Sequence, residues 1–232
     1  MTFYTIKIAR RFIRICSAAL LFLALILLAV ILFPKSDSLN NKSNSQELMA
    51  QIPDSAIVNE GIFIYKSYGN KSCAIIGVSD KSIILAEIPT QNPDGETVIE
   101  ISENAFSGCS LLTSVTISES VREIAPNAFS ECESLASILT SSSNTSFCSV
   151  DGILLNKDNT ELICYPINKA GESYLLSSSV KRIGSYAFYK VKNLKSVFYK
   201  GSTEEFETIY IGLGNDKFKK LPITCNYVPD NS

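Results

Sequence analysis

The sequence contains an internal repeat, and this repeat limits the possible folds more than any other feature. Residues 101–117 and 124–140 match at a shift of 23 positions, with Ile, Asn, Ala, Phe, Ser, Cys, Leu and a β-branched residue recurring in the same order. A third copy, residues 183–199, keeps the Ile, Ala-Phe, Leu and Val of this frame. Because a single unit of this length cannot bury its own apolar face, the copies are expected to stack into a solenoid with a shared core.

Each copy has the pattern of one short strand followed by a turn. In the first copy Leu112, Val115 and Ile117 are the apolar positions of the strand, and polar residues separate them. Their spacing and the period of 23 residues agree with leucine-rich repeats, whose period is about 20–29 residues. The predicted fold is therefore mostly β, a short leucine-rich-repeat solenoid with β-hairpin insertions and with parallel strands along one face.

A longer pattern runs through the two best-matched copies. It reads L-x-x-V-x-I-x-x-S-V-x-x-I-x-x-x-A-F-x-x-C, and its positions are Leu112, Val115, Ile117, Ser120, Val121, Ile124, Ala128, Phe129 and Cys132. This pattern resembles the BspA-like leucine-rich repeats of bacterial surface proteins. Residues 147–166 resemble the hairpin-bearing long repeat of that family, and residues 197–227 resemble its C-terminal closing segment. The resemblance covers about residues 60–228 and implies a bacterial cell-surface protein associated with adhesion.

An apolar run near the N-terminus predicts a transmembrane helix. In residues 15–33 only Ser17 is neither apolar nor cysteine, and a helix of this length spans about 28 Å, close to the ~30 Å hydrocarbon core of a bilayer. Four basic residues precede the run, and the first acidic residue is Asp37, so the N-terminus is expected in the cytoplasm. A cleavable signal peptide is the alternative, but its apolar region is usually shorter, about 7–15 residues. The run is interpreted as an uncleaved signal anchor.

These segments give a domain organisation for a single-pass protein of the cell membrane. Residues 1–14 form a basic cytoplasmic arm, 15–33 the anchor, 34–56 a flexible polar spacer, and 57–228 the extracellular repeat domain. The exported part carries 17 basic and 23 acidic residues and no basic cluster. This acidic balance argues against nucleic acid as a partner.

The composition also excludes several kinds of catalytic and metal site. The chain has no histidine, so Ser-His-Asp and Cys-His mechanisms and histidine-containing metal sites are ruled out. The acidic cluster Glu204, Glu205 and Glu207 follows Ser202, and Ser202-x-x-Glu205 is a capping box that predicts the start of a short helix. We therefore predict no catalytic residue, no cofactor and no enzymatic activity.

Two polar segments could suggest a calcium loop. They are Asp151-Gly152 and residues 157–160, and strand-like apolar residues flank both. Turn chemistry explains their composition, whereas a calcium loop needs alternating oxygen ligands closed by a bidentate carboxylate. The prediction is hairpin-turn chemistry, with strand residues 153–155 and 162–163 on either side of the turn, and no metal site.

The cysteines have two possible states. Six of the seven lie in the exported part, where three disulfides could form. Cys109 and Cys132 occupy equivalent repeat positions, and the third copy has Val191 there. A position that accepts valine is a packing position, which favours buried free thiols, but the sequence leaves both states open.

The outward positions of the predicted strands suggest a binding face. Aligned by the repeat, they form the columns Thr113/Ala136/Lys195, Ser114/Ser137/Ser196 and Thr116/Leu139/Phe198. The candidate binding residues are Thr113, Thr116, Leu139, Lys195 and Phe198, and Leu139 with Phe198 would make an apolar patch. The alternative is that the insertion at 147–166 separates or covers these columns.

The predicted function is non-catalytic recognition outside the cell. A membrane-anchored leucine-rich-repeat module would bind an extracellular protein or glycan, and adhesion is what the family resemblance implies. The alternative is an envelope-tethered accessory or sensory subunit that acts through its membrane helix.

Overall fold

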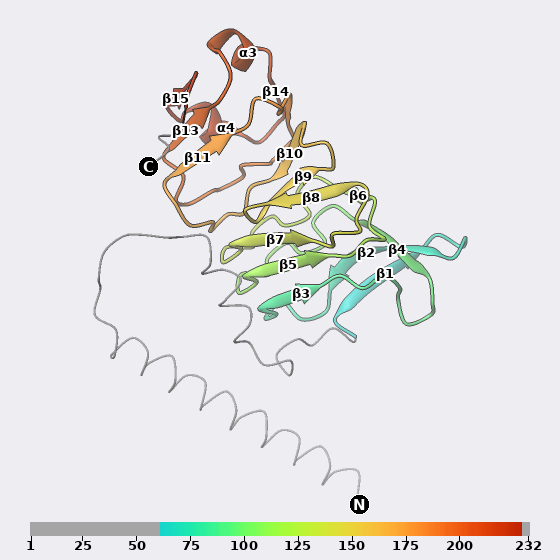
Figure 1. Cartoon of the computed structure of the whole chain (residues 1–232). Coiled ribbons are helices and arrows are strands. Elements are labelled where there is room, and N and C mark those ends of the chain that lie inside the picture. The colour runs from blue at the N-terminus through green and yellow to red at the C-terminus, as the bar shows by residue number, and fades with distance from the viewer. Residues whose placement is uncertain (1–60, 229–232) are drawn as a thin grey trace, which may run out of the picture. The chain divides into compact units, whose positions relative to one another are not determined.

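The computed structural model describes residues 61–228, which consist almost entirely of strands and turns (Figure 1). The predicted arm, anchor and spacer, residues 1–56, lie outside the described residues. Within 61–228, no helix has the length and apolar character needed to span a bilayer.

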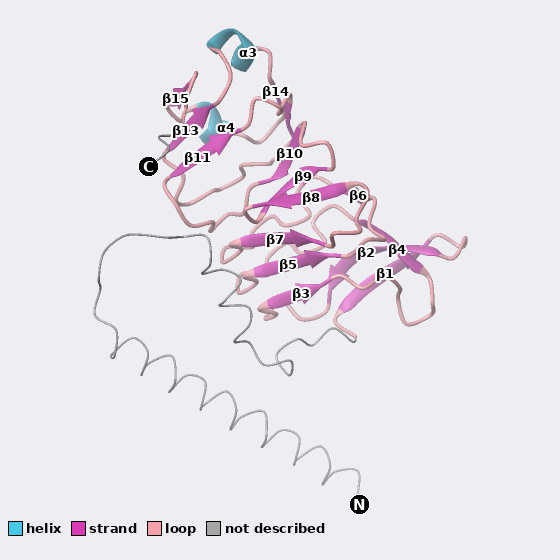
Figure 2. Ribbon diagram, in the orientation of Figure 1, coloured by secondary structure: helices cyan, strands magenta, loops and turns pink. Residues whose placement is uncertain are grey.

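The described part contains fifteen strands and two short helices (Figure 2). The helices are α3 (Thr203–Glu207) and α4 (Asp216–Lys219). The strands are β1 (Phe63–Ser67), β2 (Ser72–Val78), β3 (Leu85–Glu87), β4 (Thr97–Ile101), β5 (Ser114–Ile117), β6 (Glu123–Ile124), β7 (Ser137–Thr140), β8 (Phe147–Val150), β9 (Ile153–Asn156), β10 (Glu161–Cys164), β11 (Ser173–Leu176), β12 (Arg182–Ile183), β13 (Ser196–Tyr199), β14 (Tyr210–Ile211) and β15 (Ile223–Thr224).

Strands from equivalent repeat positions pair in parallel, which confirms the predicted solenoid. One face consists of the sheets β3-β5-β7 and β11-β13-β15, and the other face contains β2-β4-β6 and β10-β12-β14. Ser114 pairs with Ser137, and Ile101 pairs with Ile124. Each of these pairings joins residues 23 positions apart, so the sequence period is the period of the strand ladder.

The predicted hairpin insertion is also confirmed, and it interrupts both ladders. β8 and β9 pair antiparallel, and β9 pairs antiparallel with β10. Their connecting residues Asp151 and Gly152 have φ values of 51° and 73°, which is typical of a type I′ hairpin turn. As a result, β7 does not pair with β11, and β6 is the last strand of its sheet.

The inward positions of the repeats form the core. Leu112, Val115, Ile117, Leu135 and Ile138 are fully buried, and burial of each such side chain stabilises the fold by about 1.5–3 kcal/mol. The apolar residues divide into two clusters, one built mainly from residues 62–154 and the other from residues 153–218. The ladder break therefore coincides with a division of the core.

All six cysteines of the described residues are free. Cys109 and Cys132 are fully buried in the first core cluster, as expected for a packing position. Burial raises the pKa of both thiols, so both stay protonated at neutral pH and are poor nucleophiles.

Side-chain hydrogen bonds satisfy backbone groups at several turns, as two examples show. Ser202 and Glu205 form the predicted capping box at the start of α3. Asn144 is fully buried, and its amide group donates to the carbonyl oxygens of Ser118 and Val121 at 2.7 and 3.0 Å. Its Oδ1 atom accepts from the backbone N–H groups of residues 146 and 147. Asn144 thus joins the start of the hairpin to the preceding repeat.

Candidate functional site

The first part of the predicted binding face lies on the sheet β3-β5-β7. Thr116 pairs with Glu87 on one side and with Leu139 on the other, and both Thr116 and Leu139 are partly exposed. Thr113 precedes β5, and both its backbone N–H and its hydroxyl donate to the carbonyl oxygen of Ile84, at 2.7 and 3.0 Å. Thr113 is therefore held in place by the neighbouring repeat.

The hairpin lies along the β7 edge of this sheet. The Ile138 N–H donates to the carbonyl oxygen of Gly152 at 2.8 Å, and the Ser149 hydroxyl donates to the carbonyl oxygen of Ile138 at 2.6 Å. A Cβ atom added to Gly152 would lie 2.6 Å from Oγ of Ser137. The turn thus rests directly on β7, and the outward column at Ser137 is not a free surface.

The second part of the predicted face lies on the sheet β11-β13-β15. Phe198 pairs with Leu175 and Thr224, and its ring lies 4.4 Å from the ring of Tyr227, centroid to centroid. Leu175, Phe198, Thr224 and Tyr227 are called the aromatic strip below. Beside it, exposed Lys195 forms a 2.5 Å ion pair with Glu172, which contributes little to stability because water screens both charges.

The candidate residues therefore form two groups instead of one patch. Thr113, Thr116 and Leu139 belong to the first sheet, whereas Lys195 and Phe198 belong to the second, and the two sheets are not paired. The repeat alignment placed Leu139 and Phe198 in one column because it treated the second and third copies as neighbours. The insertion separates them, which was the alternative considered from the sequence.

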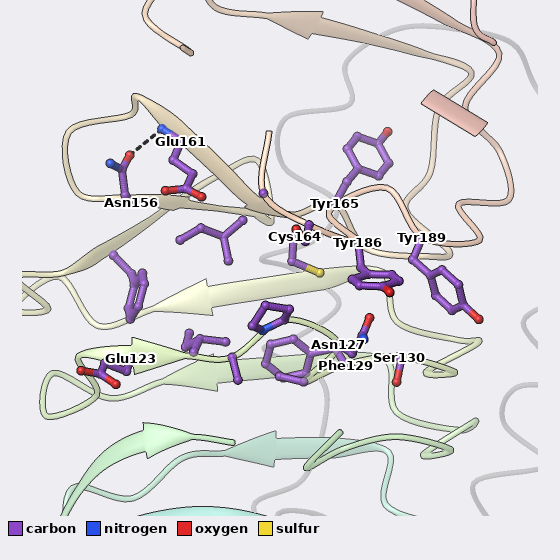
Figure 3. Close-up of a pocket in the computed structure, with 18 of the residues that line it drawn as sticks. Glu123, Asn127, Phe129, Ser130, Asn156, Glu161, Cys164, Tyr165, Tyr186 and Tyr189 are labelled. Atoms are coloured by element: carbon purple, nitrogen blue, oxygen red, sulfur yellow. Dashed lines mark hydrogen bonds between the residues drawn. The ribbon is translucent and has the colours of Figure 1, made fainter. Parts of the chain in front are cut away.

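A cleft on the opposite face was not expected from the sequence. It has a volume of about 450 Å³ and lies where the ladder breaks, between β6 and the segment around β10 (Figure 3). Asn127, Phe129 and Ser130 lie on one side, and Cys164, Tyr165, Tyr186 and Tyr189 lie on the other. Its lining comes from several separated segments, so no continuous motif marks it in the sequence.

A charged cluster connects the two halves of the array near the cleft. Nζ of Lys190 contacts both carboxylate oxygens of Glu131 at 2.7 and 2.8 Å, and the hydroxyl of Tyr189 donates to the same carboxylate at 3.0 Å. The hydrogen bonds from Lys190 and Tyr189 lower the pKa of Glu131, and the bond to Glu131 raises the pKa of Lys190. Glu131 and Lys190 occupy equivalent repeat positions with opposite charges.

Several charged groups around the cleft are paired within the chain. The Glu161 carboxylate pairs with Arg182 at 2.8 Å, and Glu100 accepts hydrogen bonds from the hydroxyls of Tyr68 and Ser102. Burial raises the pKa of the Cys164 thiol to about 12, so this group is not an activated nucleophile at neutral pH. No group of three metal-ligating side chains occurs within 61–228, and Asp151 and Gly152 form the predicted hairpin turn.

The comparisons with known proteins agree with the repeat architecture. The family described as BspA type leucine rich repeat region matches residues 88–150 and 167–226 in six copies. A search of curated proteins finds no match.

Several solved structures match as well. A leucine-rich repeat protein from Eubacterium ventriosum is 18% identical over 53% of this chain and 52% of that one, with a TM-score of 0.34. A leucine rich cell surface protein from Faecalibacterium prausnitzii is 16% identical over 61% of this chain and 70% of that one, with a TM-score of 0.32. The leucine rich repeat protein of T. pallidum is 21% identical over 75% of this chain and 91% of that one, with a TM-score of 0.39. The chain thus spans about half the length of the Eubacterium ventriosum protein.

Proposed function

The chain belongs to the BspA-type leucine-rich repeat family, and from this membership we propose that it is an extracellular recognition module that binds a protein or glycan ligand. Membership of this family supports binding or recognition as the general role of the chain. The stacked strands support the proposal because they present side chains at fixed spacings over a rigid array. Adhesion to a cell or matrix surface is the specific form of recognition that we propose.

We propose further that residues 15–33 anchor the protein in the cell membrane, with residues 1–14 in the cytoplasm. The apolar run and its basic flank support this orientation. Residues 34–56 would then hold the repeat domain away from the bilayer.

The aromatic strip is the observation that best supports a ligand-binding role. Leu175 is 36% exposed, and it pairs with Phe198, whose ring packs on Tyr227. Aromatic residues are enriched in protein interfaces because they give a large contact area for few rotatable bonds. The first sheet offers less free surface because the hairpin turn rests on β7.

The test is a binding screen with the full chain in detergent micelles. Extracellular-matrix proteins, a glycan array and intact cells serve as ligands, and an acidic protein of similar net charge is the control. For a ligand that binds the strip, Phe198→Ala is expected to weaken binding by at least about tenfold, and Thr116→Ala on the first sheet serves as the matched control. Absence of binding above the acidic control would refute the proposal.

The second candidate is an accessory or sensory subunit, which the predicted helix and basic arm favour. Cross-linking in membranes distinguishes it from the adhesin, because only this candidate requires a reproducible membrane partner. Loss of that partner on replacement of residues 15–33 by an unrelated membrane helix would support it.

A further inference from the structure

The cleft occupies the place of a missing strand. On the face that contains β2, β4, β6, β10, β12 and β14, each repeat contributes one short strand, which we call a rung. In four of these rungs, the carbonyl oxygen of an apolar residue accepts an N–H from the next rung at 2.8–2.9 Å. These bonds are Ser102 to Ile75, Ala125 to Ile101, Gly184 to Leu162 and Gly212 to Ile183.

The rung formed by β6 lacks this bond. Ile124 is the equivalent of Ile101 and Ile183, and its carbonyl oxygen has no hydrogen-bond partner among residues 61–228. The sheet ends at β6, and β10 pairs with β9 and β12 instead. Ile124 lines the cleft, so an unused backbone acceptor borders it.

An unused backbone donor borders the same cleft. The Phe106 N–H donates to the carbonyl oxygen of Ala128 at 2.8 Å, and the Phe188 N–H donates to Oδ1 of Asn215 at 2.9 Å. Phe129 is the equivalent residue between them, and its N–H has no acceptor in the described part of the chain. Phe129 is 5% exposed, and a buried N–H without a partner destabilises the protein unless something binds it.

The carbonyl oxygen of Ile124 and the N–H of Phe129, both free within residues 61–228, match the backbone of an extended peptide. In the rungs of Ile101 and Ile183 the same two positions bond to the next rung. All four donors to the carbonyl position are backbone N–H groups, whereas the acceptor at the donor position is a backbone carbonyl for Phe106 and the Asn215 side chain for Phe188. The cleft is also lined by the apolar side chains of Phe129, Phe147 and Ile163, which can receive one apolar side chain. Strand addition combines main-chain hydrogen bonds with such a pocket.

We propose that the cleft binds an extended peptide segment of a partner protein, which adds to β6 as the missing rung and places an apolar side chain against Phe129. The peptide runs parallel to β6, as β4 does on the other side. This site is separate from the aromatic strip and does not depend on the function proposed for the strip.

Asn127 provides a variant that fills the cleft. It has a φ of 61°, and its equivalent in the third copy is Tyr186, with a φ of 60°. The Tyr186 ring lies over Gly214 of the following rung, where an added Cβ atom would come within 2.1 Å of it. By analogy, Asn127→Tyr places a ring over the vacant rung in a backbone conformation that this fold already accepts for tyrosine. Asn127→Gly is the matched control, because glycine accepts the same φ and leaves the cleft open.

The experiment selects peptides from a random dodecapeptide phage library on the full chain in detergent micelles. Selected peptides are synthesised, and their affinities are measured for the wild type, Asn127→Tyr and Asn127→Gly. Each peptide is also made with single N-methyl groups along its backbone, because N-methylation removes one N–H donor. An oligosaccharide array is screened in parallel against the same three proteins.

The proposal expects Asn127→Tyr to weaken peptide binding by at least about tenfold and Asn127→Gly to change it little. N-methylation of the residue that donates to Ile124 should weaken binding by about tenfold, whereas methylation of its neighbour should not. The proposal would be overturned if the peptides bound the wild type and Asn127→Tyr with equal affinity. It would also be overturned if N-methylation at every position left the affinity unchanged, or if the library yielded no peptide. Oligosaccharide binding that Asn127→Tyr abolishes would overturn it as well. Binding of matrix proteins or cells through Phe198 should survive Asn127→Tyr, so the two proposals fail separately.

Discussion

At the residue scale, single polar side chains take over where the backbone ladder stops. Asn144 is buried and uses both ends of its amide group, whereas Asn193 is partly exposed and makes a single bond to the carbonyl oxygen of Lys169. These two asparagines provide a matched pair, because they differ in burial and in the number of backbone groups that depend on them.

Asn144→Ala should lower the free energy of unfolding by about 2–4 kcal/mol, because two carbonyl oxygens and two N–H groups lose their partner in a buried site. Asn193→Ala should lower it by less than about 1 kcal/mol. Urea denaturation of both variants measures the difference. Similar small losses for both would show that water replaces the Asn144 amide.

The contact between Glu131 and Lys190 should make stability depend on pH. The pKa of Glu131 is lowered in the folded state, so its stabilising contribution is present above the unfolded carboxyl pKa of about 4.3 and is lost as the pH falls through the folded value. Lys190 has a raised pKa, so its contribution is lost only as the pH rises through that value, in the alkaline range. Urea midpoints of the wild type and Glu131→Gln should differ at pH 7 and converge in acid. A difference that is constant between pH 3 and 7 would contradict this assignment.

At the scale of elements, the β8-β9 hairpin beside β7 determines where the strand ladders break and where the cleft forms. The sequence predicted the hairpin and the α3 capping box because both are local patterns, readable from turn residues and from Ser202-x-x-Glu205. It did not predict the cleft, because Phe129, Cys164 and Tyr186 meet there only after the insertion has displaced a strand. Leu139 and Phe198 align in the sequence but lie in different sheets, because the insertion separates their repeats.

Gly152→Ala should destabilise the protein more than Gly108→Ala. Both glycines have positive φ, 73° and 78°, so both substitutions bring backbone strain of about 1 kcal/mol. Only Gly152 has a close neighbour, Ser137, whereas nothing lies within 4 Å of a Cβ atom at Gly108. Overlap with Ser137 should add about 1–3 kcal/mol. Thermal and urea unfolding compare the two variants, and equal losses would show that the hairpin shifts freely away from β7.

At the scale of the whole molecule, two core clusters meet at the break in the ladder. Repeat arrays are stabilised mainly by contacts between neighbouring units, so a defect in one cluster should affect its own half most. Phe188 is fully buried in the second cluster, where it packs on Tyr165 and Phe218.

Phe188→Leu should therefore raise amide hydrogen exchange in residues 153–225 more than in residues 62–140. Mass spectrometry of peptic peptides measures both halves in one sample. Phe106→Leu, at the equivalent position of the first copy, is the reciprocal control. Equal increases in both halves for both variants would mean that the array opens as one cooperative unit.

The hairpin insertion also affects how the number of repeats in such chains can change during evolution. Within residues 61–228, no strand pairing joins the repeats on either side of it. The direct contacts across it are bonds of side chains and loops, such as Lys190 to Glu131 and the Asn168 N–H to the Leu135 carbonyl. The strand registers on the two sides therefore do not have to match. Duplication or deletion of a copy beside this seam leaves the strand pairing on each side intact, whereas the same event inside β3-β5-β7 requires a new match between neighbouring strands. Arrays that carry such a seam can change length over evolution while the strand faces on each side are preserved.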